Sequence, residues 1–257
     1  MAKWTAFPHL GEFQFDAAGV RRHWSRLHAG DAEPLPAEPA VLEAWVLFHN
    51  GEFHRAMEAG LQAGAAGLAV ANKAACIYAN YLEKKEKARL DLFLEAAARA
   101  EAHAAAEPGN PNAWYWLAYA LGRYSQGISV AKALAQGLGS KVKDALERAI
   151  ALQPHHADAH IALGAFHAEV IDKVGSLIGG MTYGAKKDIG LKLFQRAIAL
   201  HPGSPIALIE YANGLVMLDG VRRMKEATRL YEQAAGLAPI DAMERLDVEL
   251  ARTELED

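Results

Sequence analysis

The sequence predicts an all-α protein, folded as a solenoid of about five helix pairs. One pattern recurs along the chain: an apolar stripe of helical period that ends just before a proline, followed by a second stripe rich in small residues. Copies of this pattern end at Pro108, Pro154, Pro202 and Pro239. Alanine is abundant and runs of β-branched residues are scarce, which favours closely packed helices over sheet.

Composition limits the class of protein further. With 257 residues and 52% apolar content the chain can bury a large core, and its net charge of -4 gives no reason to expect nucleic acid or an anionic membrane as a partner. The only cysteine, Cys76, rules out an internal disulfide. No stretch reaches the roughly 18 apolar residues of a membrane span, and no signal peptide is recognisable. We therefore expect a cytoplasmic protein.

Residues 1–36 lie outside the repeat and are predicted to form an N-terminal capping segment and linker. An aromatic, turn-rich stretch comes first, and a helix from Ala17 would place Val20, Trp24 and Leu27 on one face. Three prolines then break the chain. End repeats of a solenoid need a cover for their apolar face, and this segment is the candidate.

The repeat domain is predicted to span residues 37–257. Its first pair covers Ala40 to Ala63 with Gly51 at the turn, and its second begins with a helix over about Leu68 to Leu82 and continues in a long helix with a charged, solvated start. Later first helices begin at Asn110-Pro111 and Ser204-Pro205, where an amide or hydroxyl cap precedes a first-turn proline.

Two of the pairs carry inserts. Successive repeat prolines lie 46, 48 and 37 residues apart, so two units exceed the usual period of about 34 residues. The excess falls between the two helices of each unit, at residues 123–140 and 170–187, and both inserts are rich in glycine and apolar residues. A polar helix over residues 241–257, starting at Asp241 with Glu244, is expected to cap the C-terminal end.

These features resemble the tetratricopeptide repeat (TPR) family, whose unit places Trp, Leu, Gly and Tyr in a first helix and Ala, Phe and Ala in a second helix before a proline. Trp114, Leu117 and Ala118 match the first helix, and the second is matched by Ala227, Tyr231, Ala234 and Pro239. The elongated units, with KVKDALERAIALQP and TYGAKKDIGLKLFQRAIALHP, are also similar to the TPR-like family of regulators of microtubule dynamics. The resemblance implies a helical interaction protein without catalytic residues.

Motifs that would indicate other chemistry have simpler explanations. The stretch from Gly137 to Lys141 lacks the spacing of a phosphate loop. His156 and His160 are four residues apart, as metal ligands on a helix can be, but His156 falls at or before the helix start. No nucleophile and base are readable from spacing. We therefore predict no enzyme activity, no cofactor and no metal.

The functional prediction is a scaffold that binds a protein or peptide in its concave groove. In TPR solenoids the first helix of each pair lines this groove, through residues one step off the packing stripe. Aromatic rings beside an arginine and amides suit a peptide ligand, because they offer contact area at little cost in entropy. The candidate groove residues are Trp45, His49, Asn80, Lys84, Tyr115, Trp116, Tyr119, Arg123, Glu169, Glu210 and Asn213.

Three questions stay open at this stage. The glycine-rich inserts would instead roof a cavity if the protein is a small-molecule receptor. An enzyme would need a polar constellation assembled by the fold, involving His160, His167 or Tyr183. The aromatic N-terminal segment would cover either its own first repeat or that of a second copy, so a homodimer is an alternative.

Overall fold

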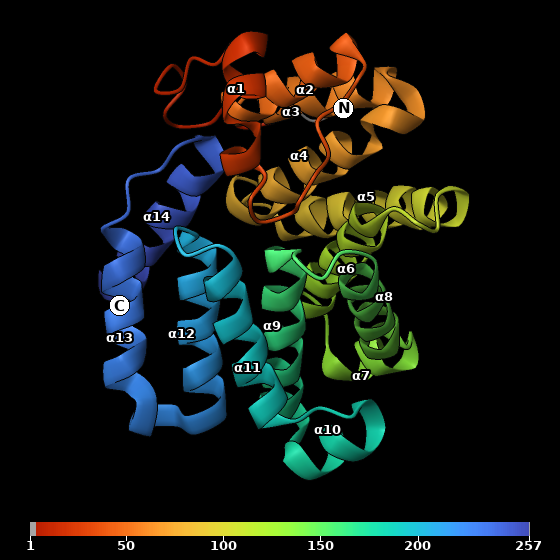
Figure 1. Cartoon of the computed structure of the whole chain (residues 1–257). Coiled ribbons are helices and arrows are strands. Elements are labelled where there is room, and N and C mark those ends of the chain that lie inside the picture. Colours follow the sequence, from red (N-terminus) through yellow and green to blue (C-terminus); the bar gives the residue numbers. More distant parts are fainter. Residues whose placement is uncertain (1–3, 257) are drawn as a thin grey trace. The chain divides into compact units, whose positions relative to one another are not determined.

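The computed structural model describes residues 4–256, and all regular secondary structure in that range is helical (Figure 1). Residues 1–3 and 257, the ends of the predicted capping segment and capping helix, lie outside the described residues. The predicted all-α fold of about five helix pairs is confirmed. The pairs are α2 (Pro39–His49) with α3 (Phe53–Gln62), α4 (Leu68–Tyr81) with α5 (Glu86–Ala106), α6 (Pro111–Gln126) with α8 (Leu138–Leu152), α9 (Ala157–Val174) with α11 (Lys187–Leu200), and α12 (Pro205–Asp219) with α13 (Met224–Ala235).

Shorter elements join or flank these pairs. The helix α1 (Ala17–Leu27) precedes them and α14 (Ala242–Glu256) follows them. Each predicted insert contains a short helix, α7 (Val130–Ala135) in the first and α10 (Ser176–Tyr183) in the second. Figure 1 shows α10 at the far end of the α9/α11 hairpin, where the chain reverses.

The helix starts follow the local sequence as predicted. The side chain of Asn110 accepts hydrogen bonds from the backbone N–H groups of Asn112 and Ala113, and Ser204 Oγ accepts one from Ala207 N at 3.2 Å. Each cap satisfies donors that the first turn of a helix leaves without partners. A proline follows each cap, where its missing N–H costs nothing.

The chain divides into two compact units. The first holds the residues up to His28, together with Glu33–Leu152 and Ile240–Met243. The second holds Ala29–Ala32, Gln153–Pro239 and the residues from Glu244 onward.

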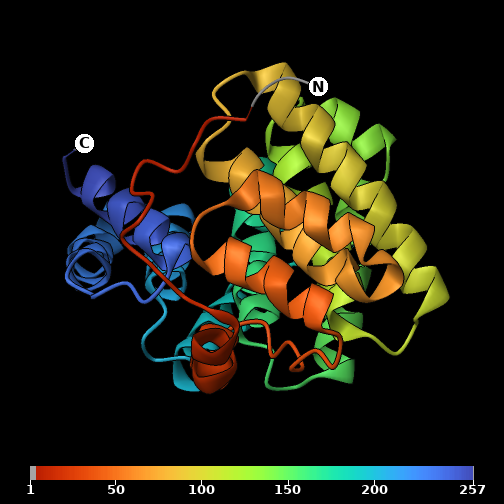
Figure 2. The same cartoon turned by 90° about the horizontal axis from the view of Figure 1, so that it is seen from above.

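The first unit is a stack of three helix pairs. Its core includes Trp45, Phe48, Tyr78 and Phe93, all fully buried. Figure 2 shows the long α5, of 21 residues, running alongside α4. All residues of α4 from Ala69 to Ala79 are buried, because helices pack around it on several sides.

The N-terminal segment packs on the first unit of its own chain. Trp4 stacks on Tyr78 with ring centroids 3.9 Å apart, and the backbone N–H of Thr5 donates to the Tyr78 hydroxyl at 3.0 Å. Phe7 is buried against Gly51, the glycine at the α2–α3 turn. In α1 the predicted apolar face, Val20, Trp24 and Leu27, is buried. These contacts support the capping role that we propose for this segment.

The second unit has an aromatic centre. Phe194 of α11 is fully buried and stacks on Tyr211 of α12 at 5.5 Å between ring centroids. Burial of a ring of this size stabilises the fold by about 2–3 kcal/mol. Ala251 of α14 packs with Ala212 and Tyr231, so this helix covers the α12/α13 pair.

Candidate functional site

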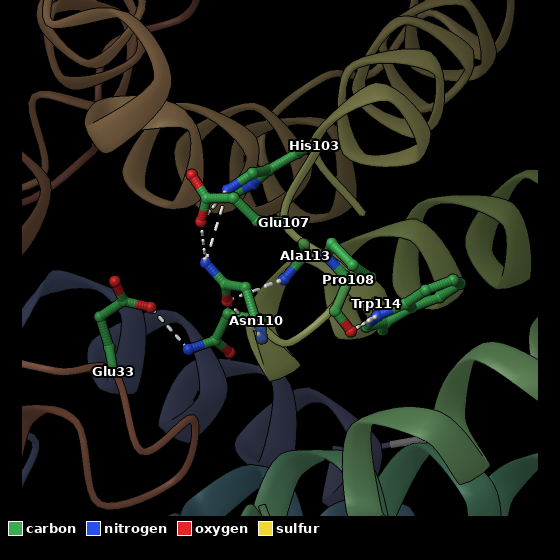
Figure 3. Close-up of polar contacts among 8 residues, drawn as sticks. Glu33, His103, Glu107, Pro108, Asn110, Ala113 and Trp114 are labelled. Carbon is green, nitrogen blue, oxygen red and sulfur yellow. Dashed lines mark hydrogen bonds and ion pairs between the residues drawn. The ribbon is translucent and has the colours of Figure 1, made fainter. Parts of the chain in front are cut away.

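The start of α6 is fixed by a network around its cap. Asn110 Nδ2 donates to Glu107 at 3.1 Å and lies 3.4 Å from His103 Nε2 (Figure 3). Asn112 in the first turn donates to Glu33. The hydrogen bond from Asn110, and secondarily the charge and hydrogen bond of His103, lower the pKa of the Glu107 carboxyl. The orientation of α6 is therefore set by polar contacts to α5 and to the segment before α2.

The tryptophans of α6 lie on different faces of the helix. Trp114 is partly exposed, and its Nε1–H donates to Pro108 O at 3.0 Å, as Figure 3 shows. Trp116, two residues later, is only 2% exposed, and its Nε1 is buried without a hydrogen-bond partner. Trp114 thus makes a hydrogen bond within the protein, whereas the indole N–H of Trp116 makes none.

Trp116 belongs to a cluster of aromatic rings on α6. Its ring centroid lies 4.8 Å from that of Tyr115 and 5.4 Å from that of Tyr119. The guanidinium carbon of Arg123 lies 5.3 Å from the Tyr119 ring centroid, within the range of a cation–π contact. Tyr119 and Arg123 are partly exposed, and Tyr115 is buried. Four of the predicted site residues therefore meet on this helix.

Two further predicted residues, Trp45 and His49 of α2, are fully buried. Trp45 lies edge-on to Trp24 and His28 of the N-terminal segment, and the ammonium of Lys73 lies 5.6 Å from its ring centroid. Burial by the N-terminal segment means that these α2 residues form core rather than an open surface.

His49 takes part in a buried chain of polar groups. Its Nδ1 lies 2.7 Å from Asp241 Oδ2, and its Nε2 lies 3.3 Å from His28 Nε2. With His49 neutral, Nδ1–H donates to the carboxylate and His28 donates to His49 Nε2. The chain links α2, the end of α1 and the segment Ile240–Met243 within the first unit.

The remaining candidates belong to several elements of the two units. Asn80 is partly exposed on α4, but Lys84 does not lie on the first helix of its pair as expected. The helix ends at Tyr81, because Leu82 and Glu83 both donate their N–H to Tyr78 O and the chain turns there. In the second unit Glu169 pairs with Lys173 at 3.7 Å, Glu210 is partly exposed on α12, and Asn213 accepts a hydrogen bond from the Tyr231 hydroxyl.

Comparison with protein families decides the classification. The family model described as regulator of microtubule dynamics protein 1-3 matches residues 64–250, most of the chain. The chain belongs to this family. Among curated proteins, none matches the sequence at a significant level.

A solved structure of a TPR protein shows the same kind of fold as this member of the regulator of microtubule dynamics family. A thermophilic TPR protein of Thermus thermophilus matches with a TM-score of 0.58 and 17% identity, over 83% of this chain and 97% of that one. YrrB, described as a TPR protein with an unusual peptide-binding site, matches with a TM-score of 0.41 and 15% identity, over 92% of this chain and all of that one. The predicted TPR-like architecture is confirmed.

The histidines at the start of α9 and along it make hydrogen bonds within the protein. His160 Nδ1 lies 2.9 Å from His156 O, and His167 Nδ1 accepts a hydrogen bond from Lys186 N at 3.2 Å. His156 caps α9 by accepting from Ala159 N. Tyr183 is partly exposed at the end of α10. Across residues 4–256, no three His, Cys, Asp or Glu side chains are placed to hold a metal ion.

Sequence reasoning missed three polar residues of the first unit. Asn72 and Lys73 are almost fully buried in α4, and Arg99 of α5 reaches Asn72. The signal is present in the sequence, since an Asn-Lys pair interrupts an otherwise apolar, alanine-rich helix.

In the described part of the chain, no helix has the length and apolar character needed to cross a bilayer.

Proposed function

We propose that this protein is a non-catalytic scaffold that binds a peptide or a segment of another protein on the side lined by the first helices of its repeats. The observation that supports this most directly is the aromatic cluster of α6, in which the partly exposed Tyr119 and Arg123 pack together over the buried ring of Trp116. Membership of a TPR-like family agrees with a scaffold of this kind. We further propose that it acts in the cytoplasm.

The chemistry of the cluster suits an extended peptide. Aromatic rings supply contact area at a small cost in conformational entropy, and such rings are enriched among residues that dominate binding energy. Trp116 is 2% exposed and its Nε1 is buried, so this ring supports the partly exposed Tyr119 ring from the core side rather than meeting a peptide itself. Arg123 adds a charged donor at the edge of the same cluster.

A peptide display experiment tests this proposal. Peptides selected on the wild-type protein from a random library are measured against Tyr119→Ala and against Trp116→Phe, which keeps a ring but removes the indole donor. We expect Tyr119→Ala to weaken binding about tenfold or more. Trp116→Phe should also weaken binding, and it should lower stability by about 1–2 kcal/mol, because a smaller ring leaves a gap at a position that is 2% exposed.

Trp114→Ala is the matched control. It removes a larger ring from the same helix, but one that bonds to Pro108 on another face. Binding unchanged in Trp114→Ala and weakened in Tyr119→Ala would support the α6 cluster as the site. If library selection yields no peptide, or if both variants lose affinity equally, the proposal is wrong.

A further inference from the structure

The short helix α10 of the second unit exposes its apolar side chains to solvent. Leu177, Ile178 and Met181 are 73%, 58% and 81% exposed. The first two precede Met181 by four and three residues, so all three lie on one side of the helix. The other side packs on α9 through Gly179, which is buried and where a Cβ would lie 2.8 Å from Val170 Cγ1. Neighbouring exposed apolar side chains of this kind mark a docking surface.

The charged residues next to this apolar face are basic. From Lys173 to Lys187 the chain contains three lysines and no acidic residue. The nearest acids along the chain, Asp172 and Asp188, lie beyond these lysines, in α9 and α11. Positive charge therefore flanks α10 on both sides.

A second basic turn lies at the same end of the second unit. It is the 3-10 turn η2 (Gly220–Arg223) between α12 and α13, and Figure 1 shows this connection at the same end of the unit as α10. Asp219 joins the two turns through an ion pair with Lys187. Arg222 and Arg223 pair with the same carboxylate at 3.6 and 3.8 Å, so one negative charge serves three cations.

This end of the unit combines exposed apolar groups with an excess of positive charge. Val221 is 84% exposed and Met224 is 44% exposed. Lys186 and Lys225 are exposed, and within residues 4–256 neither has an ion-pair partner. The net charge of -4 for the whole chain gave no reason to expect an anionic membrane as a partner, but the charge is unevenly distributed and this end is basic.

We propose that the surface formed by α10 and η2 docks on an anionic lipid bilayer. Apolar side chains of an interfacial helix enter the boundary between headgroups and acyl chains, and lysines and arginines around them attract the negative lipid surface. Leu177, Ile178 and Met181 supply the apolar contact. Lys186 and Lys225 supply the electrostatic attraction.

Charge and exposure favour a bilayer over other occupants of this surface. A second copy of the chain would bring the same positive charge against it, which opposes a symmetric contact. A protein partner needs a complementary surface packed around each side chain, whereas the apolar side chains of α10 project at the far end of a hairpin (Figure 1). A bilayer accepts projecting apolar groups without such a fit.

The proposal goes beyond peptide binding and is independent of it. The surface belongs to the second unit and shares no residue with the aromatic cluster of α6 in the first unit. Either proposal can therefore fail alone.

Flotation of the full chain with lipid vesicles tests the proposal. The vesicles contain either phosphatidylcholine alone or phosphatidylcholine mixed with phosphatidylglycerol, and the bound fraction gives a partition coefficient. We expect binding to the mixed vesicles that weakens at high salt, and little binding to phosphatidylcholine alone. If the protein does not bind the mixed vesicles, the proposal is overturned and an acidic protein segment becomes the occupant to seek.

A substitution on the apolar face tests the role of α10. Met181→Ser should weaken binding to the mixed vesicles about tenfold, because it removes most of an apolar side chain that enters the bilayer. Circular dichroism should show an unchanged fold, since Met181 is 81% exposed. Leu94→Ser, at a leucine 42% exposed on α5 of the first unit, is the control and should bind as the wild type does. No loss in Met181→Ser, or equal losses in the two variants, would contradict the proposal.

Paired lysine variants separate this surface from general charge attraction. Lys186→Gln combined with Lys225→Gln removes two positive charges from the surface, and Lys85→Gln combined with Lys141→Gln removes two exposed ones from the first unit. The first pair should weaken binding to the mixed vesicles about tenfold or more, whereas the second should leave it unchanged. Equal weakening by the two pairs would mean that the protein is attracted without a defined docking surface, and the proposal would be wrong.

A dye at position 181 reports whether α10 enters the bilayer. Met181→Cys is labelled with a polarity-sensitive fluorophore, while Cys76 is buried and stays unlabelled. We expect the emission to shift to shorter wavelength when the mixed vesicles are added. Protein that binds these vesicles without a shift in emission would dock through another face, which would also overturn the proposal.

Discussion

His49 Nδ1 and Asp241 Oδ2 lie 2.7 Å apart in the interior of the first unit, although 192 residues separate them in the sequence. This contact holds the short segment Ile240–Met243, which enters the unit from the far end of the chain, against α2. His28 extends the contact to the end of α1. One buried polar chain thus ties together parts of the unit that local sequence does not connect.

Removing the carboxylate should destabilise the protein. Asp241→Ala leaves the His49 N–H buried without an acceptor, and we expect a loss of about 2–4 kcal/mol in the free energy of unfolding. Urea unfolding followed by circular dichroism measures it. Asp188→Ala, at an exposed aspartate at the start of α11, is the control and should change stability by less than about 0.5 kcal/mol. Equal effects in the two variants would show that the buried contact does not stabilise the fold.

The packing of the N-terminal segment on the first helix pair should require a residue without a side chain at position 51. Gly51 has φ +85, and a Cβ there would collide with the ring of Phe7. Gly11 has a similar φ of +90 but no atom within 4 Å, so it carries the backbone strain without the collision. We expect Gly51→Ala to cost about 2 kcal/mol more than Gly11→Ala in thermal or urea unfolding.

The outcome of that comparison tests the capping role. If Phe7 packs on the α2–α3 turn, the larger loss at Gly51 should be accompanied by faster proteolysis of the N-terminal segment. Equal losses for the two glycines would mean that only backbone conformation matters, and that the segment does not cover the first pair in solution.

The helix pairs could be predicted because their signals are local. A proline after an apolar stripe ends a helix wherever it occurs, and the caps Asn110 and Ser204 act within three residues of themselves. The extra length between α6 and α8 follows from the spacing of the prolines alone. Each of these signals is independent of what the helix packs against.

The exposure of the site residues could not be predicted in this way. A residue one step off the packing stripe is open only if nothing else covers it, and Trp45 is covered by Trp24 and His28 of the N-terminal segment. His49 is covered through Asp241, a contact with no local signal. Lys84 lies beyond the end of α4 at Tyr81, in the loop before α5, so it is not on the first helix of its pair.

Several apolar residues of the inserts are exposed and should tolerate polar substitution. Met181 and Leu177 of α10 are 81% and 73% exposed, and Leu134 of α7 is 47% exposed. We expect Met181→Ser to change the free energy of unfolding by less than about 0.5 kcal/mol. Leu146→Ala, at a residue 1% exposed in α8, should cost about 2–5 kcal/mol in the same assay. A loss at Met181 approaching that at Leu146 would indicate that the insert is packed, as a roof over a cavity requires.

Stability should fall on mild acidification because of His160. Burial, followed by the nearby charges of Arg196 and His155, lowers the pKa of His160 in the folded protein below its ordinary value of 6.5. The unfolded chain therefore binds a proton more readily than the folded one, and stability is lost as the pH falls through 6.5 towards the folded pKa. Well above pH 6.5 the His160 side chain is neutral in both the folded and the unfolded state, so it contributes no slope.

His160→Phe isolates this effect, because it keeps a ring in the same position but cannot titrate. We expect the free energy of unfolding of the wild type to decrease more steeply than that of the variant between about pH 7 and pH 5, while the two curves run parallel above pH 7. His54→Phe is the control, since His54 is a partly exposed histidine on α3. Identical slopes for the wild type and His160→Phe would mean that the folded and unfolded states bind the proton equally well, and the buried environment assigned to His160 would be wrong.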